Sequence, residues 1–290
     1  MPHAKTSDGV HIAYQLRGDG DPLVLLAGQA NSHHWWDGVR DDFHIARSTL
    51  TIDYRGTGES DDPLTPYSTQ RFARDVIAVL DDAGIDRADV YGTSMGGRVG
   101  QWLAIRHPRR VRTLVLGCTS SGDRLSIERS NDVRRSLAVP DPAEAQSALA
   151  ELMYTPAWLA THSGPYQTLG DPTMSAPARR GHLTASRDHD AWEELPRIQA
   201  PTLVLHGSDD VLNPAANAPL IAGRIPGAEM MLIPGARHAY FEEFRATAGP
   251  PRPRLPQPKS VKGMTRDDEF FVRDELLGMA PYKRLVRLTT

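Results

Sequence analysis

VYGTSMGG, residues 90–97, is the stretch that decides the fold of this chain. It places one serine, Ser94, in the pattern G-x-S-x-G, directly after a short apolar run and before a segment of helical period. This pattern is typical of a turn between a strand and a helix that is too tight for side chains beside the serine. A phosphate-binding loop is the alternative, but it needs a lysine after the glycines, and this stretch has none in that place. The stretch therefore predicts a serine nucleophile on a strand-to-helix turn.

Apolar runs alternate with segments of helical period on both sides of this turn. The runs that predict strands are residues 22–28, 48–54, 88–92, 112–117, 201–207 and 229–235. The segments that predict helices are residues 35–44, 69–84, 95–107 and 215–224. Several runs are apolar at successive positions, as in strands that are buried on both faces. The alternation predicts an α/β fold with a doubly wound, mostly parallel sheet.

Two segments break the alternation and set the expected domain boundaries. Residues 120–195 are polar, with scattered large apolar side chains, and predict a helical lid inserted between two strands of the core, which spans residues 1–119 and 196–248. Residues 249–290 begin with GPPRPRLPQPK, in which five prolines exclude a helix or strand interior. We expect a proline-rich linker and a C-terminal tail there. A flexible appendage, an extension that contacts a protein partner and the product of an altered reading frame all fit this tail.

The composition bounds the class of protein. The chain has 290 residues, of which 40% are hydrophobic and 24% charged, and its formal net charge is −3. This is typical of a globular protein with a sizeable core, and nothing in it indicates binding to nucleic acid or to a membrane. The first residues lack the features of a signal peptide, so we expect a cytoplasmic protein. The single cysteine, Cys118, ends an apolar run and is predicted to be a buried structural thiol, with a catalytic thiol as the alternative.

A serine hydroxyl attacks a carbonyl only when a base removes its proton and a carboxylate orients that base. The stretch PTLVLHGSDDVLNP supplies Asp209 and Asp210 just beyond a predicted strand, and Asp210 is preferred because it lies further past the strand end. His238 follows the last predicted strand. Singly, the acid also fits a turn or helix cap, and the histidine fits an ordinary surface position. Together, the order Ser94, Asp210, His238 predicts a catalytic triad.

From about residue 7 to residue 244, the chain resembles the α/β-hydrolase fold superfamily, whose triads occur in this order. The stretches GTSMGGRVGQWLAIRHPRRVRTLVLGCTSS and DYRGTGESDDP are similar to the branch that contains 3-oxoadipate enol-lactonases and small-ester hydrolases. The resemblance implies a carboxylic ester or lactone hydrolase, with Arg55 bracing neighbouring loops. It does not imply a substrate, because the fold also hosts amidases, carbon-carbon bond hydrolases and cofactor-free peroxidases. Dehalogenases and epoxide hydrolases use an aspartate nucleophile, whereas position 94 is serine.

The resemblance also implies an oxyanion hole, in which two backbone N–H groups hold the charge of the tetrahedral intermediate. One donor would be Met95, at the amino end of the helix after the nucleophile, where the helix dipole favours an anion. The other would be Gln29 in LLAGQANSHHWW. Members of the family often carry His-Gly in this loop, but this chain has Ala27 and Gly28. A backbone donor survives that change, although the hydrogen bonds that support the loop must differ.

None of the eleven histidines lies in an H-x-x-E-H or H-x-H arrangement with a carboxylate at ligand spacing, so we predict no metal site and no cofactor. His33 and His34 fit either the mouth of a pocket or a solvated loop. His182 and His189, in the insertion, are interpreted as part of a polar helix face.

The aromatic and methionine side chains of the insertion are expected to form its packing and an apolar pocket wall over Ser94. The predicted pocket residues are Met153, Tyr154, Trp158, Tyr166 and Trp192. The sequence therefore predicts a serine hydrolase that cleaves a small ester or lactone with an apolar portion, through an acyl-enzyme on Ser94. Carbon-carbon bond hydrolysis would use the same residues. A catalytically weak ligand-binding protein of the same fold is the alternative from another class.

Overall fold

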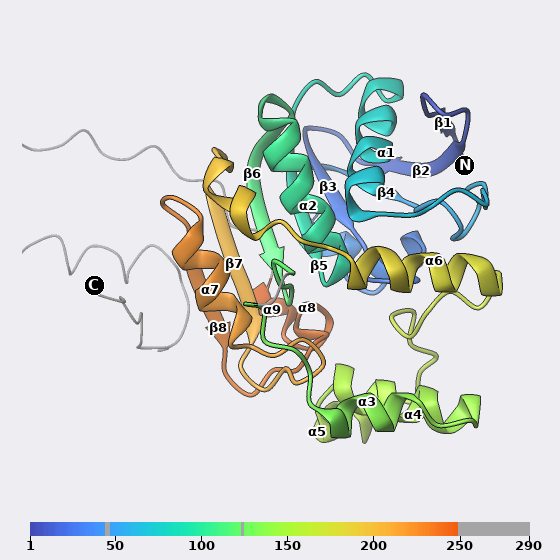
Figure 1. Ribbon diagram of the computed structural model, residues 1–290, viewed down its shortest axis with the longest axis vertical. Coiled ribbons are helices and arrows are strands. Elements are labelled where there is room, and N and C mark those ends of the chain that lie inside the picture. The colour runs from blue at the N-terminus through green and yellow to red at the C-terminus, as the bar shows by residue number, and fades with distance from the viewer. Residues whose placement is uncertain (44–46, 123–124, 249–290) are drawn as a thin grey trace, which may run out of the picture. The chain divides into compact units, whose positions relative to one another are not determined.

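The computed structural model describes residues 1–43, 47–122 and 125–248 (Figure 1). A sheet with the strand order β1-β2-β4-β3-β5-β6-β7-β8 runs through this part of the chain. The strands are β1 (His3–Lys5), β2 (His11–Arg17), β3 (Asp21–Leu26), β4 (Arg47–Ile52), β5 (Ala88–Thr93), β6 (Val111–Gly117), β7 (Thr202–Gly207) and β8 (Glu229–Ile233). The pairs β1·β2 and β2·β4 are antiparallel, and all later pairs are parallel. The predicted mostly parallel sheet is confirmed.

The six predicted strands correspond to β3 through β8, and the sequence did not predict β1 and β2. The sequence HIAYQLR of β2 mixes buried and exposed side chains and ends in three residues that face partly or fully into solvent. It therefore lacks the continuous apolar run by which the parallel strands were found.

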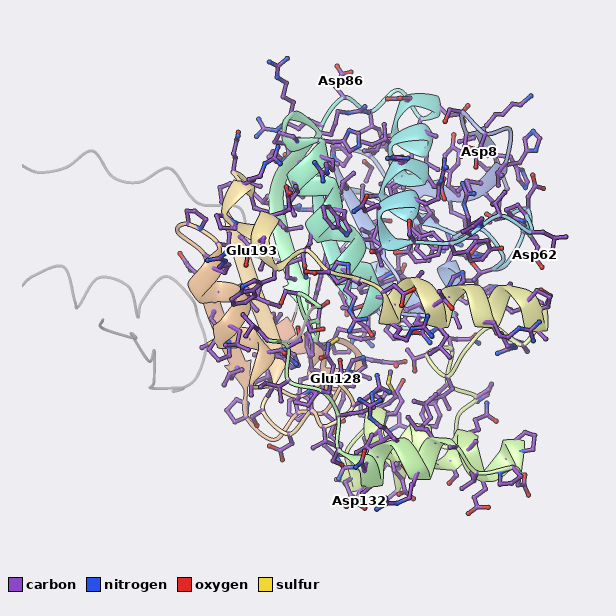
Figure 2. The ribbon with its side chains drawn as sticks, in the orientation of Figure 1. Asp8, Asp62, Asp86, Glu128, Asp132 and Glu193 are labelled. Carbon is purple, nitrogen blue, oxygen red and sulfur yellow. The ribbon has the colours of Figure 1, made fainter. Side chains whose placement is uncertain are left out.

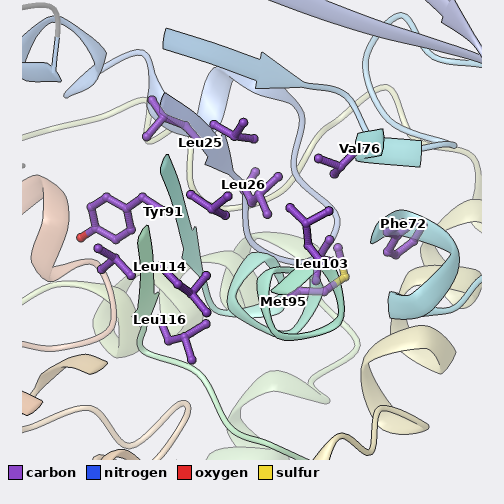
Figure 3. Packing of buried hydrophobic residues seen from close by; sticks show 14 of the residues in the cluster. Leu25, Leu26, Phe72, Val76, Tyr91, Met95, Leu103, Leu114 and Leu116 are labelled. Atoms are coloured by element: carbon purple, nitrogen blue, oxygen red, sulfur yellow. The ribbon is translucent and has the colours of Figure 1, made fainter. Parts of the chain in front are cut away.

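Two helices next to the sheet follow the predicted pattern. Helix α1 (Thr69–Asp82) begins where the Ser68 hydroxyl accepts a hydrogen bond from the Arg71 N–H, and it buries one face that includes Phe72 and Val76. Helix α2 (Met95–Arg106) contacts β3, β5 and β6, and it packs beside α1 (Figure 1). In Figure 3, Leu114 and Leu116 of β6 face α2, whereas Leu25 and Tyr91 lie on the other face of the sheet.

Helix α7 (Asn217–Arg224) follows β7, and helices α8 (Tyr240–Glu243) and α9 (Arg245–Ala248) follow β8.

The predicted helix over residues 35–44 is wrong in its described part, which forms the short 3-10 helices η1 (His33–Trp36) and η2 (Arg40–Phe43). Trp35 and Trp36 are adjacent and both buried, and each ring lies 5.3 Å from the ring of Phe241. A short turn accommodates two neighbouring buried side chains more readily than a surface helix, which buries only one stripe.

Helices α3 (Asn131–Leu137), α4 (Pro142–Met153), α5 (Pro156–Leu159) and α6 (Ala176–Arg187), with the 3-10 helix η4 (Trp192–Arg197), lie between β6 and β7. Each of α3 to α6 begins at a Ser, Thr or Asp whose side chain accepts a backbone N–H of the first turn. Helices α3 to α5 form a group apart from the sheet, and α6 runs between that group and α1 (Figure 1). We call residues 120–195 the insertion.

Cys118 is fully buried just after β6, as predicted for a structural thiol, and burial raises its pKa well above the ordinary value. No helix among the described residues has the length and apolar character needed to cross a bilayer. The predicted linker and tail, residues 249–290, lie outside the described residues.

Candidate active site

Ser94 lies on the turn between β5 and α2, with a backbone φ of 55° and ψ of −120°. A left-handed φ at a residue other than glycine costs on the order of 1–3 kcal/mol and is often found at functional sites. The glycines on either side are required by close packing. A Cβ on Gly92 would lie 2.2 Å from the Gly96 carbonyl oxygen, and one on Gly96 would lie 2.1 Å from that of Leu26. The pattern G-x-S-x-G is therefore a consequence of how tightly this turn folds on itself at Gly92 and how closely it approaches β3 at Gly96.

Hydrogen bonds from the end of β6 hold the serine turn. The Ser94 N–H donates to the Gly117 carbonyl over 2.8 Å, and the Thr119 hydroxyl donates to the Ser94 carbonyl over 2.7 Å. The Ser94 side chain is half-buried, in keeping with a hydroxyl that a substrate can reach.

Asp210 and His238 meet at the same edge of the sheet. Asp210 follows β7, His238 follows β8, and the His238 Nδ1 lies 2.7 Å from the Asp210 Oδ2. Both residues are 2% exposed. The neighbouring Asp209 is exposed and accepts a hydrogen bond from the Ser208 hydroxyl. The structure thus brings Asp210 to the histidine and leaves Asp209 in solvent, as the sequence analysis preferred.

The Asp210 carboxylate has two further hydrogen-bond donors. Its Oδ1 accepts the Asn213 N–H over 2.9 Å, and its Oδ2 lies 3.2 Å from the His206 Nε2. That nitrogen also lies 2.8 Å from the Asn213 carbonyl, so it faces two acceptors and must carry a proton. Burial alone would raise the pKa of Asp210, but the charge of His238 and the hydrogen bonds from both histidines hold it well below its usual range. Sequence reasoning missed His206, whose only signal is a histidine inside the apolar run of β7.

Ser94 and His238 share the edge of the sheet but make no hydrogen bond with each other among the described contacts. Ser94 follows β5, and β5, β6, β7 and β8 are successive parallel strands whose carboxyl ends meet at one edge. Hydrogen bonds between a nucleophile and its base often form fully only in the substrate complex.

The two N–H groups assigned to the oxyanion hole have no acceptor within the described part of the chain. They belong to Met95, the first residue of α2, and to Gln29, which follows β3. Gly28 is required beside them, because a Cβ there would lie 2.5 Å from the Trp35 ring. Free N–H groups at the ends of β3 and β5 are suited to binding an anion.

The two loop histidines differ from each other, and the two histidines of the insertion differ from expectation. His33 is buried, and both its N–H and its Nδ1 contact the Asp53 Oδ1, whereas His34 is exposed beside Asp37. The assignment of His182 and His189 to a polar helix face is wrong, because they are 0% and 3% exposed. Each of these two imidazoles has two hydrogen-bond partners within the protein, so neither needs water to satisfy its nitrogens.

The expected bracing by Arg55 is present. Its guanidinium contacts Asp75 of α1 over 2.6 Å and Asp8, between β1 and β2, over 3.1 Å. Figure 2 shows Asp8 on the same side of the molecule as α1 and Asp62 beside α6.

Across residues 1–43, 47–122 and 125–248, no group of three or more His, Cys, Asp or Glu side chains could hold a metal ion.

The structure gathers three aromatic residues of the predicted pocket. The Tyr154 ring lies 6.1 Å from that of Trp158 and 4.8 Å from that of Tyr166, and Met153 is buried next to Tyr154. Trp192 does not join this group, because its ring lies under the Arg224 guanidinium of α7 at 5.1 Å.

The aromatic group is tied to the segment around the candidate base. The Ala239 N–H donates to the Met153 carbonyl over 2.8 Å, and the Tyr154 hydroxyl donates to the Glu242 carboxylate. A cleft of about 240 Å³ beside this junction contains neither Ser94 nor His238. It is lined by Ser136, Ala148, Glu151, Leu152, Asp209, Val211 and Arg237.

Comparison with known proteins identifies the family. A family model described as alpha/beta hydrolase fold matches residues 21–244. A protein of Azorhizobium caulinodans named putative carbamate hydrolase RutD is 29% identical over 246 residues, which are 83% of this chain and 92% of the relative. A crystal structure of a hydrolase from Pseudomonas aeruginosa PA01 is 31% identical, with a TM-score of 0.73 over 85% of this chain and 94% of the other. The structure of Est816, described as an N-acyl homoserine lactone degrading enzyme, is 29% identical, with a TM-score of 0.74 over 85% and 96% of the two chains. Sequence, strand order and the serine turn thus agree, and the chain belongs to the α/β-hydrolase fold family as an enzyme of the hydrolase class.

Proposed function

We propose that this hydrolase cleaves a small ester or lactone with an apolar portion through an acyl-enzyme on Ser94. The observation that carries the proposal is the buried hydrogen bond of 2.7 Å between the His238 Nδ1 and the Asp210 Oδ2, at the sheet edge where Ser94 lies. A histidine oriented in this way is the base that a serine nucleophile requires.

Each step of the reaction uses groups at this edge of the sheet. Asp210 keeps the proton of His238 on Nδ1, so Nε2 is free to take the proton of the Ser94 hydroxyl. The serine oxygen then bonds to the carbonyl carbon, and the negative oxygen of the tetrahedral intermediate accepts the N–H groups of Gln29 and Met95. The bond to the leaving oxygen breaks as His238 Nε2–H protonates it. Water repeats the sequence on the acyl-enzyme, releases the acid and restores Ser94, and no step requires a cofactor.

The insertion is proposed to act as a lid that selects the substrate. The rings of Tyr154, Trp158 and Tyr166 pack together, Trp158 and Tyr166 are partly exposed, and the group is anchored to the segment that follows His238. The resemblance to Est816, whose description names a lactone, supports a cyclic or linear ester. Carbon-carbon bond hydrolysis would use the same triad.

Two assays test the proposal. A fluorophosphonate probe should label the wild-type protein at Ser94 and should not label S94A. A panel of p-nitrophenyl esters, lactones and carbamates of graded size, with β-diketones as substrates for carbon-carbon cleavage, should then show turnover that is lost in S94A. Turnover by S94A equal to that of the wild type would contradict the proposed nucleophile, and turnover confined to carbon-carbon substrates would support the alternative reaction.

A further inference from the structure

The loop that carries the Gln29 N–H is held by the insertion. The Asn31 side chain accepts the Gly170 N–H over 3.0 Å, and the Ala30 carbonyl accepts the Asp171 N–H over 2.7 Å. Ala30 itself has a φ of 57°, a strained value for an alanine. A strained loop keeps its conformation only where its surroundings impose it, and here the surroundings come largely from residues about 140 positions later in the chain.

His182 of α6 completes this support. The Ala30 N–H donates to the His182 Nδ1 over 3.3 Å, and the His182 Nε2 lies 2.9 Å from the Arg55 carbonyl oxygen. Nδ1 faces a donor and Nε2 faces an acceptor, so the imidazole carries its single proton on Nε2. Burial lowers the pKa of His182 to about 4, which keeps the ring in this neutral form near neutral pH.

The contacts fix one peptide plane in the loop. The peptide between Gln29 and Ala30 is planar, its carbonyl accepts the Asn31 side-chain N–H over 2.8 Å, and its N–H donates to His182. Both ends of the plane are therefore held, and with them the backbone of Gln29. The Gln29 N–H lies on the other side of the Gln29 Cα, so its direction is restrained through only the two dihedral angles of Gln29.

The imidazole is itself immobilised. The rings of Phe72, Tyr67 and Tyr54 lie 5.0, 5.6 and 6.2 Å from it. Helix α6 is anchored at its first turn, where the Ser175 hydroxyl donates to the Asp62 Oδ2 over 2.5 Å.

We propose that His182 is a positioning residue, which aims the Gln29 N–H at the oxyanion by holding the Gln29–Ala30 peptide of this loop. The inference rests on the proposed function, because an oxyanion forms only if Ser94 attacks a carbonyl.

The test compares variants that keep or lose the acceptor for Ala30. H182F keeps a ring but removes both hydrogen bonds, and it should lower kcat about tenfold to a hundredfold with little change in KM, because a misplaced oxyanion donor weakens mainly the transition state. In H182N, the side-chain oxygen takes the place of Nδ1, so this variant should recover most of the lost kcat even if it is thermally less stable. H189N is the matched control: His189 is equally buried and contacts Thr69 and Gln101 but no residue of the loop, so kcat should stay at the wild-type value.

A trifluoromethyl ketone supplies an independent readout, because its adduct with the serine places an oxyanion in the hole. Its Ki should rise in H182F by the factor lost in kcat/KM. An unchanged kcat in H182F, an unchanged Ki despite a lower kcat, or an equal loss in H189N would overturn the role of His182. Absence of probe labelling and turnover in the wild type would instead overturn the proposed function itself.

Discussion

The Asp210–His238 pair and the loop of Gln29 lie at the same edge of the sheet as Ser94, but different parts of the chain set their positions. Asp210 and His238 follow the adjacent strands β7 and β8, so strand pairing brings their side chains together. The Gln29 loop also follows a strand, yet it takes its conformation from residues of the insertion, His182 among them. One half of the site therefore depends on the sheet, whereas the other depends on how the insertion packs against the core. Variants in the two regions should differ accordingly in their effects.

The largest effect is expected at Ser94, the proposed nucleophile on which both halves of the site are proposed to act. S94A should lower kcat by several powers of ten while the fold stays intact, because triad members act as a unit. Steady-state kinetics on the best ester, with circular dichroism and Tm as controls, measures the change. Comparable turnover in S94A would show that neither half of the site does the chemistry assigned to it.

The next largest effect is expected at Asp210, in the half of the site whose position depends on strand pairing. D210N should lower kcat about 10⁴-fold, because an amide cannot hold the tautomer in which the His238 Nε2 accepts a proton. D209N is the matched control, since the Asp209 side chain is exposed and contacts Ser208. Its kcat should be almost that of the wild type. If D209N lost more kcat than D210N, the orienting role would belong to Asp209, in contradiction to the observed geometry.

An intermediate effect is expected from the aromatic group of the insertion. Alanine at Tyr154, Trp158 or Tyr166 should shift the preference among acyl or lactone sizes about tenfold to a hundredfold, because apolar contacts of this kind discriminate by only about 1–3 kcal/mol. W192A should lower Tm and leave the preference unchanged, because the ring contacts Arg224 of α7. Competition between substrates of different size in one assay gives the ratio directly. A change in preference in W192A alone would place the pocket on the other side of the insertion.

The same contrast explains what could be predicted from the sequence. The strands β3 to β8 and the turn at Ser94 have local signals, which are apolar runs and glycine spacing. Asp210 and His238 could be inferred because a parallel sheet brings successive strand ends to one edge. The catalytic roles of these residues stay predictions.

The contacts of the oxyanion loop could not be predicted, because they join distant parts of the chain. Ala30 and His182 are 152 residues apart, and His182 is buried because α6 packs against Phe72 of α1 and against the rings of Tyr54 and Tyr67. On a helical pattern alone, a histidine beside arginines and threonines fits a solvated face. His206 is a similar case, since the partner that explains it, Asp210, is reached only through the turn after β7.

The smallest expected effect concerns the contact between the insertion and the segment after His238, and it is a change of stability with pH. Burial raises the pKa of Glu242 above the ordinary value, and the hydrogen bond from Tyr154 and the charges of Arg245 and His162 only partly oppose this. A carboxyl group whose pKa is higher in the folded chain holds its proton more tightly there. The contribution of Glu242 to stability is therefore greatest below its unfolded pKa of about 4.3, and it is lost as the pH rises through the folded pKa.

E242Q should remove this dependence, because its amide is neutral at every pH and its oxygen still accepts the Tyr154 hydroxyl. Thermal unfolding of both proteins between pH 4 and pH 7 measures the difference. The Tm of E242Q should exceed that of the wild type at pH 7, and the two should converge toward pH 4. A wild type that is the more stable protein at pH 7 would show that the ionised carboxylate strengthens the contact with the insertion, and the sign of the argument would be reversed.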